Sequence, residues 1–316
     1  VFRVQSRPTK EESLLLPGAM GGDGDPPSVH GATLVDYKTE RLMHLMGERL
    51  YFSVHESEER TLHLIQSFPS IFFFSSFIPE SYRPFCADFG PLDIVGVLRF
   101  VDYVKDKMDH PRLQHRRVVY YCPDNPAAIT NASLLLCCYL VIDKGFSPEQ
   151  AAARFDRIVG LPIEPFRDAT WEPSTYHLSV LSCLQGLQKA ISVGILDLRT
   201  FSVTEYESVY EAPEYDMNRI THRCVAFACP KNHPDQHNAV ARKPSLHVEP
   251  FRRLGVTDVV RLNEEGFYDD TEFVLMHGFR HHALEFKDCT VPTPELVESF
   301  LDIMDAAGGG VVAVHC

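Results

Sequence analysis

The 316-residue chain lacks a long apolar run, a surplus of basic residues and a regular cysteine spacing. A membrane helix needs about 20 apolar residues, and the longest apolar stretch, residues 132–140, fits a buried core helix instead. The 43 acidic against 30 basic residues give a net charge of −13, which argues against general nucleic-acid binding and suits a basic protein partner. Nine cysteines without the spacing of a disulfide framework or a zinc site indicate a reducing compartment. We therefore expect no membrane and no nucleic-acid partner.

The most informative feature that is present is an apolar run, residues 311–316, which ends in His315-Cys316. A cysteine at a strand end that faces a helix N-terminus has a lowered pKa, and the N–H groups there also bind phosphate. This ending is typical of cysteine-dependent phosphatases. Most cysteines at strand ends are inert core residues, however, so the pattern needs support from the residues that precede it.

Asp288 supplies that support as a candidate general acid, 28 residues before Cys316. It follows an apolar stretch and precedes Thr293-Pro294-Glu295, which predicts a helix N-cap, a proline at the first helical position and a first-turn acid. The oxygen that leaves phosphorus needs a proton. A loop between a strand and a helix can bring the carboxyl group of Asp288 over the substrate.

Residues 86–122 repeat this arrangement in a form that lacks the chemistry. Asp88 precedes an amphipathic helix pattern, and the strand that follows it ends at Cys122. The six residues after Cys122 contain no glycine to let N–H groups converge and no arginine to hold phosphate, and Asp124 would repel an anion. We interpret the first copy as a phosphatase-shaped domain without catalysis. A chance similarity between two α/β domains is the alternative.

Composition and hydrophobic pattern divide the chain into four segments. We expect a disordered segment over residues 1–40, a first domain over 41–198, an acidic linker over 199–221 and a second domain over 222–316. The expected helices of the first domain cover residues 127–144, 148–159 and 176–193. The expected strands of the second domain cover residues 224–227, 256–262 and 281–286.

Five stretches carry a resemblance to a known family: residues 82–92, 165–169, 197–207, 261–263 with 268–269, and 279–316. Together they resemble the cell-division-cycle-fourteen type of dual-specificity protein phosphatase, over both domains in order. The resemblance implies an α/β fold with two tandem phosphatase-like domains, each a central mixed sheet flanked by helices. It also implies that only the second domain hydrolyses phosphoserine, and less so phosphothreonine and phosphotyrosine, through a phosphocysteine intermediate without any cofactor or metal.

The resemblance also assigns roles to individual residues. Cys316 becomes the nucleophile, Asp288 the general acid and His315 the histidine that supports the thiolate. The family typically has glycine after the acid, where this chain has Cys289. The phosphate-binding loop and its arginine would follow Cys316, so we expect the second domain to be cut at that loop and residues 1–316 to be inactive by themselves.

Five acids lie within residues 205–216, and three of them match substrate-binding positions of the family. The resemblance implies that Glu207, Glu211 and Asp216 line an acidic groove at the domain junction, which receives the basic residue after a Ser-Pro site. It also places Asp168, in one of the similar stretches, among the substrate-binding residues. Without the resemblance, an ordinary solvated helix face is the simpler interpretation.

The implied partners are phosphorylated substrates of proline-directed kinases. The implied role is cell-cycle control, in the nucleus and cytoplasm, including the cytoskeleton or spindle. Two alternatives stay open. One is a phosphoinositide phosphatase on the same fold, which a basic loop after the cysteine would favour. The other is a non-catalytic scaffold that binds phosphoproteins, which the first domain shows the fold permits.

Overall fold

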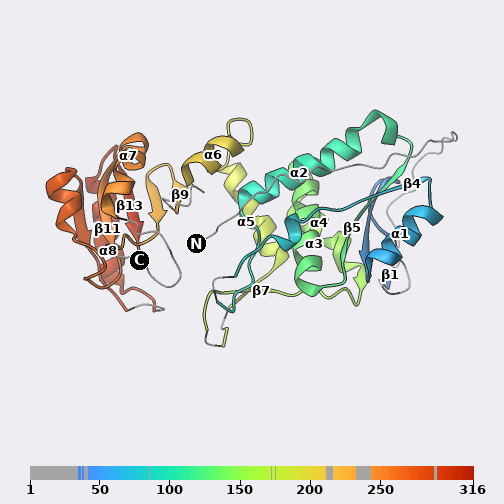
Figure 1. The fold of residues 1–316 in the computed structure, drawn as a ribbon, viewed down its shortest axis with the longest axis horizontal. Coiled ribbons are helices and arrows are strands. Elements are labelled where there is room, and N and C mark those ends of the chain that lie inside the picture. Colours follow the sequence, from blue (N-terminus) through green and yellow to red (C-terminus); the bar gives the residue numbers. More distant parts are fainter. Residues whose placement is uncertain are drawn as a thin grey trace. The chain divides into compact units, whose positions relative to one another are not determined.

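The computed structural model describes residues 35–36, 38, 42–84, 86–171, 173–174, 176–210, 216–232, 243–287 and 290–316. These residues form two compact units, one that ends at Gly194 and one from Ile195 to Cys316. In Figure 1 the first unit runs from blue to yellow and the second from yellow to red. Each unit is built around its own sheet.

Among its described residues, the first unit contains a four-stranded mixed sheet, two short strand pairs and five α-helices. The strand order is β2-β3-β5-β4, in which β3, β5 and β4 are parallel and β2 is an antiparallel edge strand. The sheet strands are β2 (Met43–Met46), β3 (Leu50–His55), β4 (Ile71–Phe74) and β5 (Arg117–Pro123). The helices are α1 (Glu58–Ser67), α2 (Ile94–Asp109), α3 (Pro126–Ile142), α4 (Pro148–Asp156) and α5 (Val180–Ser192), with the 3₁₀ turns η1 (Ile78–Glu80) and η2 (Pro111–Leu113).

The helix α3 packs against α2, α4 and α5 and is buried on nearly every side (Figure 1). Its N-terminus is capped by the Asn125 side chain, which accepts a hydrogen bond from the Ala128 N–H at 3.1 Å, and Pro126 occupies the first turn. The predicted helix over residues 127–144 is confirmed, and Cys137 and Cys138 are buried in the core. Although α3 is strongly apolar, no helix in the described ranges is long and apolar enough to span a bilayer.

Short strand pairs shorten the two other helices predicted for the first unit. The predicted helix over residues 148–159 ends at Asp156, because β6 (Ile158–Val159) pairs with β1 (Val35–Asp36). The predicted helix over residues 176–193 begins too early, because β8 (His177–Leu178) pairs with β7 (Phe166–Arg167). Ser179 then caps α5. In both cases a distant strand competes for backbone groups that a local pattern assigns to a helix.

The second unit contains a five-stranded sheet in the order β12-β11-β13-β10-β9. The first four strands in this order are parallel, and β9 is an antiparallel edge strand. The strands are β9 (Met217–Thr221), β10 (Cys224–Phe227), β11 (Val256–Arg261), β12 (Arg280–Ala283) and β13 (Val311–His315). The helices are α6 (Val203–Tyr210), α7 (Pro244–Leu254), α8 (Pro294–Ala306) and the π-helical turn η3 (Glu272–Met276). Much of the expected acidic linker is therefore regular structure, in α6 and β9.

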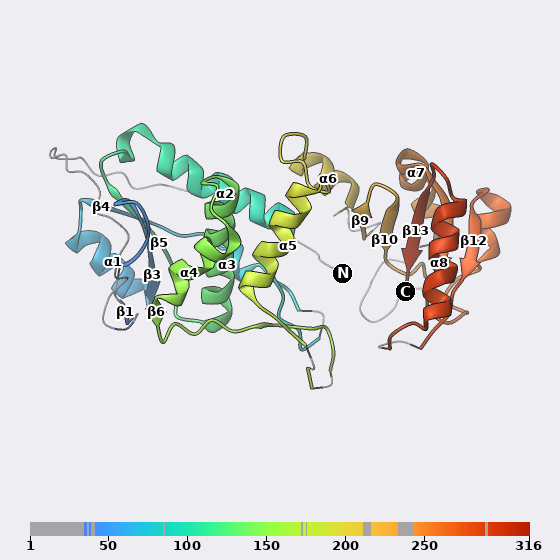
Figure 2. The ribbon, with the colours of Figure 1, turned by 180° about the vertical axis from the view of Figure 1, so that it is seen from behind.

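The two faces of this sheet bury different cores, because side chains alternate along β13. Val311 and Ala313 pack with residues of α7 and η3, whereas Val312 and Val314 pack with α8. Figure 2 shows α8 lying across the sheet. The side of α8 away from the strands remains open, and Leu301 is 54% exposed. The strand β13, which Cys316 follows, is thus covered by helices on both faces.

Gly310 lets β13 lie close to β11. A Cβ atom at Gly310 would overlap the side chain of Thr257 in β11, whereas one at Gly309 would meet nothing within 4 Å. We expect Gly310→Ala to lower the free energy of unfolding of the second unit by about 1–3 kcal/mol. Gly309→Ala is the control and should change it by less than about 0.5 kcal/mol. Urea unfolding checks both variants, and equal stabilities would contradict this role of Gly310.

Candidate active site

Cys316 follows the central strand of the second sheet and is exposed. The strand β13 lies between β11 and β10 and is parallel to both, so its carboxyl end emerges beside theirs. Ligands of open α/β sheets bind outside the carboxyl ends of parallel strands. The chain therefore places the Cys316 thiol at the edge of the sheet where an α/β protein binds its ligand.

His315, the last residue of β13, is buried and neutral. Its Nε2 atom lies 2.8 Å from the Tyr268 hydroxyl oxygen. Burial lowers the pKa of His315 to about 3, and two nearby histidines and Arg261 act in the same direction. Any support that His315 gives to Cys316 at neutral pH therefore comes from hydrogen bonding and not from a positive charge.

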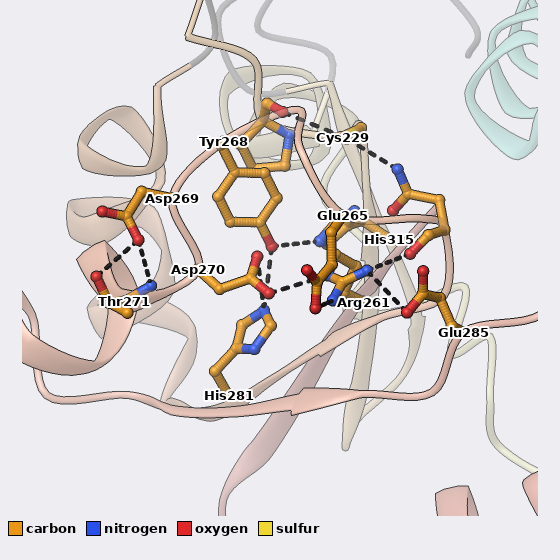
Figure 3. A network of polar contacts seen from close by, with 12 residues as sticks. Cys229, Arg261, Glu265, Tyr268, Asp269, Asp270, Thr271, His281, Glu285 and His315 are labelled. Atoms are coloured by element: carbon orange, nitrogen blue, oxygen red, sulfur yellow. Dashed lines mark hydrogen bonds and ion pairs between the residues drawn. The ribbon is translucent and has the colours of Figure 1, made fainter.

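A buried arginine, Arg261, gathers acidic side chains at the carboxyl end of β11 (Figure 3). Its Nε atom donates to Asp270 Oδ2 at 3.1 Å, and carboxylate oxygens of Glu265 and Glu285 lie 3.6 and 3.7 Å from its other nitrogens. It also donates to the main-chain oxygen of Asn263. Sequence reasoning gave this arginine no role. The signal that could have found it is a cation placed directly after the valines of a buried strand.

Tyr268 joins this ion-pair cluster to the end of β13. Its hydroxyl oxygen lies 2.8 Å from His315 Nε2 and 3.1 Å from His281 Nε2. The same His281 nitrogen lies 3.7 Å from Asp270 Oδ1. Burial raises the pKa of the Tyr268 hydroxyl far above its ordinary value, so the hydroxyl keeps its proton. A continuous polar network therefore leads from Asp270 to the residue before Cys316 (Figure 3).

The converging histidines do not form a metal site. Within the ranges that the structure describes, no group of three or more His, Cys, Asp or Glu side chains is placed to hold a metal ion. Instead, His281 and His315 contact the hydroxyl of Tyr268, and Asp270 pairs with Arg261. The arrangement fits hydrogen bonding between these groups.

Two of the predicted site residues, Asp288 and Glu211, lie outside the described residues. The helix that should follow the general acid is present, because α8 begins as the sequence predicts. The Thr293 side chain accepts a hydrogen bond from the Leu296 N–H at 3.4 Å, and Pro294 is the first helical residue. The role of Asp288 as general acid stays a prediction.

The remaining predicted substrate-binding residues belong to different units. Glu207 is half-buried on α6, and Asp216 precedes β9 with a positive φ of 44°. The Tyr206 hydroxyl donates to Asn218 Oδ1 at 2.9 Å, which ties α6 to β9. The structure thus brings the elements that carry Glu207 and Asp216 together. Asp168 is exposed after β7, in the first unit.

The first unit has its own cysteine at the corresponding place, Cys122 near the end of β5. Burial raises the pKa of this thiol, and two nearby acids act in the same direction. Burial also raises the pKa of Asp88, but hydrogen bonds from the Tyr82 hydroxyl and the Cys86 N–H outweigh it and lower the pKa overall. A protonated Cys122 and an ionised Asp88 are the reverse of what a thiolate nucleophile and a general acid need. This supports a first domain without catalysis.

Comparison with known proteins places the chain in a family. Residues 44–190 match the family model "Dual specificity protein phosphatase, N-terminal half". Human dual specificity protein phosphatase CDC14C is 31% identical over 271 residues, which are 85% of this chain and 58% of the relative. The zebrafish (Danio rerio) dual specificity protein phosphatase CDC14AB is 34% identical over 273 residues, 85% of this chain and 43% of the relative. By sequence, the chain belongs to the CDC14 family of dual specificity protein phosphatases.

Human dual specificity protein phosphatase CDC14A is 32% identical over 275 residues, which are 86% of this chain and 44% of the relative. A match over this share of the chain includes both units. The chain therefore spans about half the length of the curated relatives that it matches. The crystal structure of P. aeruginosa TpbA matches 33% of this chain and 55% of that chain at 23% identity with a TM-score of 0.25, too low to bear on the fold. The predicted CDC14-type family and the α/β class with two mixed sheets are confirmed.

Proposed function

We propose that this protein is a dual-specificity protein phosphatase of the cell cycle, with Cys316 as its nucleophile. The observation that carries the proposal is the position of Cys316, exposed at the carboxyl end of the central parallel strand and directly after a buried, neutral histidine. The buried Cys122, whose thiol pKa is raised, supports the proposal that the chemistry belongs to the second unit alone.

The proposed reaction has two steps. The Cys316 thiolate attacks phosphorus, so that an S–P bond forms while the P–O bond to the substrate breaks, and Asp288 protonates the leaving oxygen. Water then attacks the phosphocysteine, the S–P bond breaks, and inorganic phosphate leaves as the thiolate is restored. Neither step requires a metal ion or an organic cofactor.

The proposed substrates are phosphoserine, phosphothreonine and phosphotyrosine proteins, chiefly Ser-Pro sites of proline-directed kinases that are followed by a basic residue. Glu207, Glu211 and Asp216 are the proposed contacts for that residue, and Asp168 is a further proposed substrate-binding residue. The contact between α6 and β9 supports a shared role for Glu207 and Asp216. We propose that the protein acts in the nucleus and cytoplasm, including the cytoskeleton or spindle.

Assays of the complete gene product separate this proposal from its two rivals. Release of phosphate from a Ser-Pro phosphopeptide supports a protein phosphatase. Faster release from phosphoinositide vesicles than from any phosphopeptide identifies a lipid phosphatase. Phosphopeptide binding without turnover of either substrate identifies a scaffold.

Residues 1–316 by themselves are expected to show no turnover of para-nitrophenyl phosphate. The reason is that this polypeptide contains no N–H groups after Cys316 to stabilise the charge that develops on phosphate oxygens. The measurement is the release of para-nitrophenol by the purified polypeptide. Release that disappears in Cys316→Ser would contradict the expectation.

Removal of the acidic charge on α6 and before β9 should selectively lower kcat/KM for substrates with a basic residue. We expect the triple variant Glu207→Lys, Glu211→Lys and Asp216→Asn to lower kcat/KM for a Ser-Pro-x-Lys phosphopeptide about tenfold, since each exposed contact contributes about 0.2–1 kcal/mol. Asparagine is chosen at position 216 because it tolerates the positive φ found there. Hydrolysis of an aryl phosphate, which has no basic residue, should stay unchanged.

A control variant with the same change of net charge uses exposed acids of α8, as Glu298→Lys, Asp302→Lys and Asp305→Asn. It should keep the wild-type preference for the basic over the neutral phosphopeptide. Higher salt should shrink this preference in the wild-type enzyme, because exposed charges are screened. If the triple variant still prefers the basic peptide as strongly as wild type, these acids form only a solvated surface.

A further inference from the structure

A second cysteine, Cys229, lies at the same edge of the second sheet as Cys316. It comes two residues after β10, which is parallel to β13 and adjacent to it. The register of these strands sets Ala226 opposite Val314. The rings of the next residue on each strand lie with centroids 4.9 Å apart, so the two chains stay side by side. One more step sets Ala228 opposite Cys316, and Cys229 follows directly.

The Cys229 side chain extends across the end of β13. That strand lies between β10 and β11, so the backbones that leave β10 and β11 are about 10 Å apart, twice the spacing of neighbouring strands. The Sγ atom of Cys229, after β10, nevertheless accepts a hydrogen bond from Asn263 Nδ2, after β11, at 3.5 Å (Figure 3). These two side chains therefore meet over the end of the strand that Cys316 follows.

The electrostatics of Cys229 agree with this placement. Burial raises the pKa of its thiol and outweighs the hydrogen bond from Asn263, and a negative charge on Cys316 acts in the same direction as burial. The thiol donates to the main-chain oxygen of Pro230 at 3.3 Å. Cys229 therefore keeps its proton at neutral pH, and its sulfur lies within electrostatic reach of Cys316.

The two cysteines differ in access but are close enough to be joined. Cys316 is exposed, whereas Cys229 is half-buried. An exposed thiolate reacts with peroxides, and a covered, protonated thiol does not. Residues that are level or one step apart on neighbouring strands have Cα atoms about 5–6 Å apart, which is within the range of about 4.4–6.8 Å that a disulfide spans. A peroxide therefore oxidises Cys316 first, with Cys229 beside it.

We propose that Cys229 is the resolving cysteine of an oxidation site at Cys316, where a peroxide joins the two residues in a disulfide. In the first step the Cys316 thiolate attacks one peroxide oxygen. An S–O bond forms, the O–O bond breaks, and the other oxygen leaves as hydroxide or alkoxide. In the second step the Cys229 sulfur attacks the sulfenic sulfur. An S–S bond forms, the S–O bond breaks, and the proton of Cys229 leaves with that oxygen as water.

The disulfide would both stop and protect the proposed phosphatase. Turnover stops because the sulfur of the nucleophile is bonded to Cys229. Protection follows because a disulfide is reduced by thiols, whereas the sulfinic and sulfonic acids that form on further oxidation are not. The inference rests on the proposed function only for the loss of turnover. The disulfide itself is measurable without any enzymatic activity.

Peptide mapping by mass spectrometry tests the disulfide in the complete gene product. The protein is treated briefly with hydrogen peroxide, its remaining thiols are alkylated, and it is digested without reductant. We expect the peptides of Cys229 and Cys316 to be linked. Cys316 as sulfinic or sulfonic acid next to an unmodified Cys229 overturns the proposal, and so does a disulfide between Cys316 and any other cysteine.

Recovery of activity tests the protective role of Cys229. After peroxide treatment, wild type should regain most of its turnover of para-nitrophenyl phosphate in dithiothreitol. Cys229→Ala should match wild type before treatment but regain about fivefold less turnover, because its Cys316 goes on to the irreversible acids. If this variant fails to fold, Cys229→Ser decides, since serine is closer to cysteine in size and accepts from Asn263. Recovery equal to that of wild type overturns the proposal.

Cys224→Ala is the matched control, because Cys224 lies at the other end of the same strand, opposite Val312. It should form the Cys229–Cys316 disulfide and recover like wild type. A loss of recovery as large as that of Cys229→Ala would count against a specific role of Cys229. If the two peptides are linked but reduced wild type has no phosphatase activity, the proposed function fails and the oxidation site stands.

Discussion

Cys316→Ser is expected to lower turnover by the complete gene product about 10⁴-fold or more while phosphopeptide binding is retained. A serine hydroxyl is not ionised at neutral pH, so the phosphoenzyme does not form. The substitution exchanges one exposed atom at a strand end and should leave the fold unchanged. Release of inorganic phosphate measures turnover, and fluorescence anisotropy of a labelled phosphopeptide measures binding.

Cys122→Ser is the matched control for this prediction. Cys122 also lies near the end of a parallel strand, but it is buried and its thiol pKa is raised. Its replacement should leave turnover close to that of wild type in protein that remains folded. If Cys122→Ser loses as much turnover as Cys316→Ser without unfolding, the catalytic role assigned to the second unit is wrong.

Asp288→Asn should lower kcat for a phosphoserine peptide about 10²–10³-fold. An amide does not donate a proton to the leaving oxygen, and a serine alkoxide is too basic to leave without one. An aryl phosphate has a more acidic leaving group, so its hydrolysis should fall much less. The measurement is the ratio of kcat values for phosphoserine peptide and para-nitrophenyl phosphate in wild type and variant.

Asp88→Asn is the control for the general acid, because the sequence pattern gives Asp88 the corresponding place in the first unit. It should leave this ratio as in wild type, whatever it does to stability. An equal loss on both substrates in Asp288→Asn would show that Asp288 has a structural role and that another group protonates the leaving oxygen.

The sequence was sufficient to predict helices and strands where local patterns agree with the final packing. The helix α3 follows from a largely apolar stretch after the cap Asn125-Pro126, and α8 follows from the Thr293-Pro294 start. The strand β10 has the limits that its apolar residues predict. The His-Cys ending likewise marked the end of a buried strand, because a short valine-rich run is typical of a parallel strand that is covered on both faces.

The sequence failed where a segment is decided by a distant partner. Residues 158–159 and 177–178 leave their expected helices because β1 and β7 pair with them. Residues 217–221 had no apolar alternation to mark them as a strand, yet they pair with β10 at the sheet edge as β9. Backbone hydrogen bonds to another strand depend little on side-chain pattern, so such pairs are not visible in one sequence.

The sequence by itself identified the strand followed by the proposed nucleophile Cys316, the order of the two α/β domains and the family. Only the tertiary structure decided what surrounds the ending. Arg261, His281 and His315 lie on three different strands, and parallel pairing sets Arg261 opposite His315 and Val259 opposite His281. Because side chains alternate with a period of two, this register turns all three toward one face, where Tyr268 joins the histidines. Residues 20 to 54 positions apart meet through strand register, which no local sequence pattern encodes.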